Sequence, residues 1–264
     1  MSWSKYVLLA IFVFSIILSS GCVKQDTSSN SFMKIDMGVE HPSIFAGGEE
    51  TFYSDITNDA NKDYNNFVFT VFDAPFFKGT CEKKLSKLNR KSHFYLECKL
   101  TSDELDIPKG GTSSSVSMAT NFDGVESMYQ QIETISQEEF FRNKVQTKPS
   151  HYSTSDGYIE IDSDFQSELP IVYTKDRNYT VLFKIKNVGP GVIDNMSIDI
   201  IDKNGILKKC NPEPKSITYE GGNEVTFGCI INPPVTKVLN SQGVIINVDY
   251  KYKIIKNVIV EIKR

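Results

Sequence analysis

Five cysteines constrain this 264-residue chain more than any other feature. Four of them form two spaced pairs, one in each half, and the fifth, Cys22, follows a short apolar segment near the N-terminus. Cys81 lies 23 residues after Asn58, and Cys210 lies the same 23 residues after Asn187. The equal spacing predicts two copies of one domain, each with its own pair of cysteines.

The alternation of apolar and polar side chains repeats together with the cysteines, and such alternation predicts strands with one buried face. The matching segments are 32–36 with 158–162, 51–58 with 178–187, and 65–71 with 194–200. Each copy is expected to close with two further strands, 113–122 with 127–135 and 244–252 with 256–263. A repeat of about 105 residues in six or seven short strands fits an immunoglobulin-like sandwich, which has roughly 100 residues.

These patterns predict an all-β chain with two tandem immunoglobulin-like β-sandwich domains. The Ser136 hydroxyl, with Glu139 three residues later, predicts a short helix at the start of the connection between them. The expected organisation is a signal or anchor segment 1–21, a polar tether 22–31, a first sandwich 32–135, a linker 136–156 and a second sandwich 157–264.

The N-terminus has the features of an export signal. A single charge at Lys5 precedes an apolar run from Tyr6 to Leu18, and small residues then lead to Cys22. The run is short for a bilayer span, which needs about 20 residues. Cys22 resembles the lipidated cysteine of a lipobox, although Ser19 stands where Leu is usual. The alternative is an uncleaved anchor helix, and both predict an extracytoplasmic chain anchored to the membrane.

The two cysteine pairs are expected to be disulfides, Cys81–Cys98 and Cys210–Cys229, because exported proteins meet an oxidising compartment. The rival interpretation is a metal site. Zinc sites usually have closely spaced Cys or His pairs, and the sequence has none.

No catalytic motif appears in the sequence. The zincin HExxH, the hydrolase GxSxG and a Gly-rich phosphate loop are all missing, so neither an enzyme nor a cofactor is expected. Asp59, Asn61 and Asp63 have the alternating spacing of a calcium loop, but the Gly and the bidentate Glu of such a loop are missing. A polar turn is the alternative interpretation of this segment.

The sequence also contains two N-glycosylation motifs and has a mildly negative net charge. Asn178 and Asn195 begin N-glycosylation sequons, which matter in an exported chain, although Asn195 also fits an ordinary turn. The formal net charge is −4 and there is no basic stripe, so nucleic acid is not an expected partner.

The run Tyr179-Thr-Val-Leu-Phe-Lys-Ile-Lys-Asn-Val-Gly-Pro-Gly191 resembles the opening strand and turn of CARDB-like domains, an immunoglobulin-like group linked to cell adhesion. Tandem copies behind a lipoprotein signal resemble archaeal cell-surface and S-layer-associated proteins. The first copy departs from the pattern, because Asn58-Asp-Ala-Asn61 lacks the Gly-rich turn. The resemblance implies a fold and a location, and it assigns no functional residues.

Three functions are therefore in competition. The first is a membrane-anchored surface protein without enzymatic activity, which contacts other envelope proteins or glycans. The second is an envelope subunit of a secretion, pilus or motility complex. The third is a glycan-active hydrolase with dispersed carboxylates, whose separation a sequence cannot give.

Overall fold

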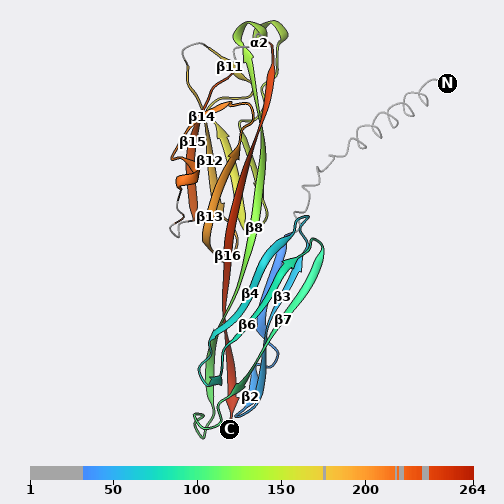
Figure 1. The fold of residues 1–264 in the computed structure, drawn as a ribbon, viewed down its shortest axis with the longest axis vertical. Helices are drawn as coiled ribbons and strands as arrows, with labels where there is room; N and C mark the ends of the chain where they lie inside the picture. Colours follow the sequence, from blue (N-terminus) through green and yellow to red (C-terminus); the bar gives the residue numbers. More distant parts are fainter. Residues whose placement is uncertain (1–31, 175–176, 218, 220–222, 234–237) are drawn as a thin grey trace, which may run out of the picture. The chain divides into compact units, whose positions relative to one another are not determined.

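Alternating apolar side chains fold most of the described chain into β-strands, which confirms the all-β, sandwich-type fold (Figure 1). The computed structural model describes residues 32–174, 177–217, 219, 223–233 and 238–264. Cys22, the signal segment 1–21 and the tether 22–31 lie outside the described residues.

Two sheets each belong to one half of the chain. The first has the strand order β1-β3-β7-β5, with bounds β1 Met33–Val39, β3 Glu49–Asn58, β5 Phe77–Lys78 and β7 Ser92–Ser102. The second has the order β14-β15-β12-β10-β9, with bounds β9 His151–Ser155, β10 Ile159–Phe165, β12 Tyr179–Asn187, β14 Leu207–Asn211 and β15 Glu224–Ile231. A short 3-10 helix, Pro214–Ser216, lies between β14 and β15.

A third sheet, which we call the shared sheet, contains strands from both halves, in the order β13-β16-β8-β4-β6. Two short strands extend it, because β11 pairs in parallel with β8 and β2 pairs in parallel with β16. The bounds are β2 Ser43–Phe45, β4 Tyr64–Asp73, β6 Cys81–Leu88, β8 Thr112–Ser136, β11 Ile171–Tyr173, β13 Val192–Ile201 and β16 Asn240–Lys263.

The predicted closing hairpins are wrong. β8 and β16 are continuous strands that pair with each other without a break, from Thr112 opposite Ile262 to Thr134 opposite Asn240. The first part of β8 also pairs with β4, and its last residues pair with β11 of the second half. In return, β16 pairs first with β13 and then with β2 of the first half. The end of β8 thus belongs to the second half in space, and the end of β16 belongs to the first half.

Residues 123–126, where a turn is predicted, are a straight part of β8, and Gly124 allows a close contact there. Gly124 is extended and lies directly opposite Tyr250 of β16. A Cβ atom at this position would lie 2.3 Å from Cζ of the Tyr250 ring, so only glycine lets the ring lie across the strand.

The two halves match at the end of one strand pair each, as the predicted repeat requires. Met33 pairs with Asn58 in the first half, and Ile159 pairs with Asn187 in the second. Both asparagines end their strand in the same way, because each side-chain amide donates to the carbonyl four residues later, Lys62 O at 2.9 Å and Gly191 O at 2.8 Å.

The predicted linker 136–156 is only partly a linker. Helix α2 (Gln137–Asn143) begins as predicted, because the Ser136 hydroxyl accepts the Glu139 backbone N–H at 3.2 Å. Residues 151–155 then form β9, which pairs with β10 and is therefore part of a sheet. The predicted boundaries at 135/136 and 156/157 consequently do not separate the strands of the two halves.

The core is continuous through the exchange of strands. Buried side chains from both halves form one hydrophobic cluster. Phe122 of β8 lies at its centre, where its ring contacts five others, those of Tyr64, Phe67, Tyr158, Tyr250 and Tyr252, with centroid distances from 5.0 to 6.4 Å.

Candidate functional site

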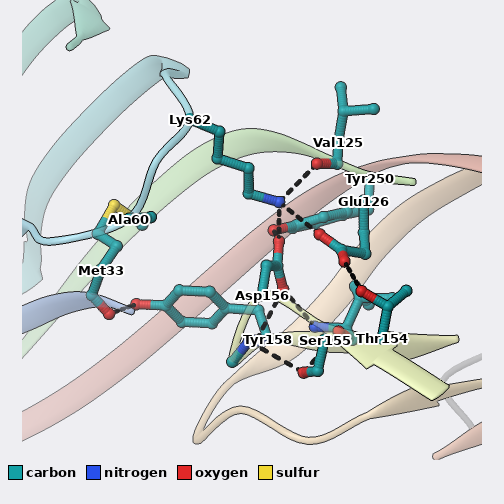
Figure 2. A network of polar contacts seen from close by, with 12 residues as sticks. Met33, Ala60, Lys62, Val125, Glu126, Thr154, Ser155, Asp156, Tyr158 and Tyr250 are labelled. Carbon is teal, nitrogen blue, oxygen red and sulfur yellow. Dashed lines mark hydrogen bonds and ion pairs between the residues drawn. The ribbon is translucent and has the colours of Figure 1, made fainter. Parts of the chain in front are cut away.

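A buried polar cluster lies where the two halves exchange strands, and we call Lys62, Glu126, Asp156 and Tyr250 the junction cluster (Figure 2). Each of its side chains comes from a different element. Lys62 lies in the loop between β3 and β4, Glu126 on β8, Asp156 in the turn between β9 and β10, and Tyr250 on β16.

The Lys62 ammonium contacts both carboxylates of the cluster. Its Nζ donates to Glu126 Oε2 at 2.9 Å and to Asp156 Oδ2 at 2.5 Å. A third hydrogen bond of 2.5 Å goes to the Val125 carbonyl. The second oxygen of Glu126 accepts the Thr154 hydroxyl at 3.0 Å, so this carboxylate is held from both sides.

The two oxygens of Asp156 have different surroundings. Oδ1 accepts the backbone N–H groups of Tyr158 at 2.9 Å and Ile159 at 2.8 Å. Oδ2 faces Lys62 and also accepts the hydroxyl of Tyr250. The turn between β9 and β10 thus fixes the carboxylate in one orientation.

Burial shapes the electrostatics of this cluster. The side chains of Asp156, Glu126 and Lys62 are 3%, 10% and 27% exposed. Burial raises the pKa of Glu126, against the opposing effect of Lys62, so this carboxyl holds a proton more readily than an exposed glutamate does. Burial also raises the pKa of Tyr64, Tyr158 and Tyr250, so their phenols stay neutral.

A polar groove of about 460 Å³ lies on the outward face of the shared sheet, and we call it the junction groove. One row of its lining crosses four strands, because Asn195 pairs with Lys251, Lys251 with Asp123, and Asp123 with Asn65. Bulges interrupt β4 after Asn65 and β13 before Asn195. Bulges re-aim side chains and often occur next to functional sites.

The predicted calcium ligands are engaged in contacts within the protein. Asp63 pairs with Lys87 at 2.7 Å and accepts the Arg90 backbone N–H at 2.8 Å, and the Lys87 hydrogen bond lowers the pKa of this carboxyl. Asp59 pairs with Lys34 at 3.9 Å, and Asn61 is exposed. Within the described parts of the chain, no three His, Cys, Asp or Glu side chains are grouped to hold a metal ion.

Both predicted glycosylation sites are accessible in the structure. Asn178 is exposed just before β12, and Asn195 is exposed on β13, where it lines the junction groove. Their modification stays a prediction.

The two predicted disulfides are confirmed, Cys81–Cys98 and Cys210–Cys229. They are not equivalent in space. Cys81 begins β6 of the shared sheet and Cys98 lies on β7, so the first bridge joins two sheets. Cys210 and Cys229 lie opposite each other on the neighbouring strands β14 and β15.

Removing the first bridge is expected to destabilise the fold measurably. Its loop spans 17 residues, and in the chain-entropy model a loop of this size contributes about 3 kcal/mol. The variant with Cys81→Ala and Cys98→Ala should therefore unfold at a lower guanidinium concentration, monitored by circular dichroism without reductant. Unchanged stability would contradict the assignment of this bridge as structural.

Sequence reasoning missed the junction cluster. Lys62 was visible only as a residue inside the candidate calcium loop, and its two acidic partners are 64 and 94 residues away. No local pattern connects residues so far apart, so the sequence contained no signal for the cluster.

Comparison with known proteins identifies no family for this chain. No protein-family model matches the sequence, and no curated protein matches it. Among solved structures, a red sea bream transglutaminase has a TM-score of 0.26 and 8% identity, with 87% of this chain and 31% of that chain covered. The sporulation control protein Spo0M of Bacillus subtilis has a TM-score of 0.22 and 11% identity, with 58% and 79% covered. The secreted serine protease VesC of Vibrio cholerae has a TM-score of 0.23 and 9% identity, with 86% and 51% covered.

The chain thus spans about a third of the length of the matched transglutaminase. Similarity at these TM-scores carries no argument about activity.

Proposed function

We propose that this chain is an extracytoplasmic surface protein, anchored to the membrane through Cys22, with a binding or scaffold role and no enzymatic activity. The observation that carries the proposal is the pair of disulfides on a β-sandwich fold. Disulfides persist in oxidising compartments outside the cytoplasm and are rare in the cytosol. None of the helices in the described ranges is long and apolar enough to cross a bilayer.

The shared sheet supports a scaffold role. β8 and β16 pair along 23 consecutive residues each, so both halves are connected by two continuous strands in place of a flexible linker. The outward face of this sheet carries the junction groove, whose polar lining suits contact with glycans or polar protein surfaces.

An envelope subunit of a secretion, pilus or motility complex is the alternative. Crosslinking on intact cells, followed by mass spectrometry of the linked peptides, separates the two. Crosslinks to several unrelated surface proteins or glycoproteins would support a surface binding role. Crosslinks to one defined membrane complex, which also co-purifies with the chain, would support the alternative.

The Cys22→Ala variant is expected to leave the membrane fraction, because it cannot carry the lipid. Cell fractionation and immunoblotting of the variant and the unchanged chain measure this. The matched control is the Ser20→Ala variant, which keeps the Cys22 thiol and should stay in the membrane. A Cys22→Ala variant that stays in the membrane at the size of the mature protein would rule out lipid anchoring.

A further inference from the structure

We propose that the chain joins Lys62 to Asp156 by an amide bond between their side chains, with Glu126 transferring the protons. This modification goes beyond the proposed surface role. It would connect the loop after β3 in the first half to the turn before β10 in the second half, across 94 residues of sequence.

The reacting groups are already in contact. The Lys62 nitrogen donates to Asp156 Oδ2 at 2.5 Å. The backbone holds both partners, because Lys62 follows the strand end at Asn58 and Asp156 is fixed by its own turn. An amine held against a carboxyl group reacts as in an intramolecular reaction, with the entropy of encounter already lost.

The two oxygens of Asp156 are arranged for this reaction. When the amine attacks Cγ, negative charge develops on Oδ1, which already accepts the N–H groups of Tyr158 and Ile159 at 2.9 and 2.8 Å. Donors at such distances stabilise a tetrahedral oxyanion. Oδ2 is then the leaving oxygen, and the Tyr250 hydroxyl donates to it.

The proton transfers balance without any further reactant. The Lys62 ammonium gives a proton to the Glu126 carboxylate, and the resulting amine forms a bond to Cγ of Asp156. Two of the three ammonium protons reach Oδ2 by way of Glu126, the bond between Cγ and Oδ2 breaks, and one water leaves. The third proton stays on the amide nitrogen, and Glu126 ends as the carboxylate it was at the start.

The surroundings favour the neutral product over the ion pair. Asp156 and Glu126 are almost fully buried, and two carboxylates with one ammonium cost solvation energy there. Aromatic side chains surround the site, with the Tyr64 ring 5.2 Å from the Lys62 nitrogen. The raised pKa of Glu126 supports its role as a carrier of protons.

Lys186 provides a contrast within the same chain. It contacts Glu160 at 3.0 Å and also Asp162, so it too lies between two carboxylates. However, Lys186 and Glu160 are about one-third exposed, and hydrogen bonds to Asp162 and Glu160 raise the pKa of Lys186, which keeps it protonated. The Lys186 ammonium therefore gives up a proton less readily, and its neighbour Glu160 is 30% exposed where Glu126 is 10% exposed, so this site should stay unlinked.

Peptide mass spectrometry of the purified full chain, digested with trypsin after reduction and alkylation, tests the proposal. The expected product is a branched peptide that joins segment 35–78 to segment 145–175, with cleavage after Lys62 blocked and a mass lower than the sum of both peptides by one water. Cleavage after Lys186 in the same digest should proceed normally and serves as the internal control.

Two variants test the assigned roles. Lys62→Arg keeps the positive charge but removes the nucleophilic amine, and Glu126→Gln keeps the size of the side chain but cannot carry the protons. Both should lose the branched peptide, while circular dichroism and intact disulfides show that they fold. Complete cleavage after Lys62 in the folded, unchanged chain would overturn the proposal, and an undiminished link in Glu126→Gln would overturn the role of Glu126.

Discussion

A fragment of residues 155–264 is expected to be unfolded when it is produced alone. It would lack residues 122–134 of β8, which pair with residues 240–252 of β16 and, at their end, with β11. The shared sheet would then end at β16, and the core face that β8 covers would be open to water. Far-ultraviolet circular dichroism under oxidising conditions measures the result.

Mixing this fragment with a second fragment, residues 32–154, should restore the β signal, because each supplies the strand that the other lacks. The matched control is the full chain with a protease site inserted after Lys144, at the end of α2 and outside every strand. Cleavage there should leave the fold intact. Cooperative unfolding of fragment 155–264 by itself would show that the second half is an independent domain.

Phe122→Ala is expected to lower the free energy of unfolding by about 3–5 kcal/mol, as is typical for a buried Phe. Phe122 is 1% exposed, and its ring contacts residues that both halves contribute, including Tyr64 and Tyr158. The cavity would therefore open where the strands are exchanged. Guanidinium denaturation of the variant and the unchanged chain gives the difference in the free energy of unfolding.

Tyr129→Ala is the matched control for this substitution. Tyr129 lies on the same strand, seven residues further on, but its side chain points outward and is 66% exposed. The Tyr129 ring lies over Gly243 of β16, so we expect a small loss, closer to the roughly 0.5 kcal/mol of ordinary surface substitutions than to the loss for Phe122. Equal losses for both variants would show that the ring contacts of Phe122 contribute little.

The all-β class, many of the strands and the matching spacing of the two halves follow from the sequence alone. Alternation identifies which face of a strand is buried, and this property is local because successive side chains point to opposite faces. The matching ends at Asn58 and Asn187 and the cap at Ser136 are equally local, since each involves hydrogen bonds within a few residues. The cysteine pairs could be assigned because their spacing repeats and an exported chain is oxidised.

The partners of the strands were decided only by the tertiary structure. Residues 112–136 show the same alternation whether they fold into a hairpin or continue as one strand, so the pattern contains no information on the exchange. The continuous strands bring together residues far apart in the sequence, such as Tyr250, whose ring lies across Gly124, 126 positions away. The junction cluster depends on the same exchange, because Lys62, Glu126 and Asp156 meet only when β8 passes from one half into the other. Local sequence determines the elements here, and long-range packing determines which of them pair and which charges become buried together.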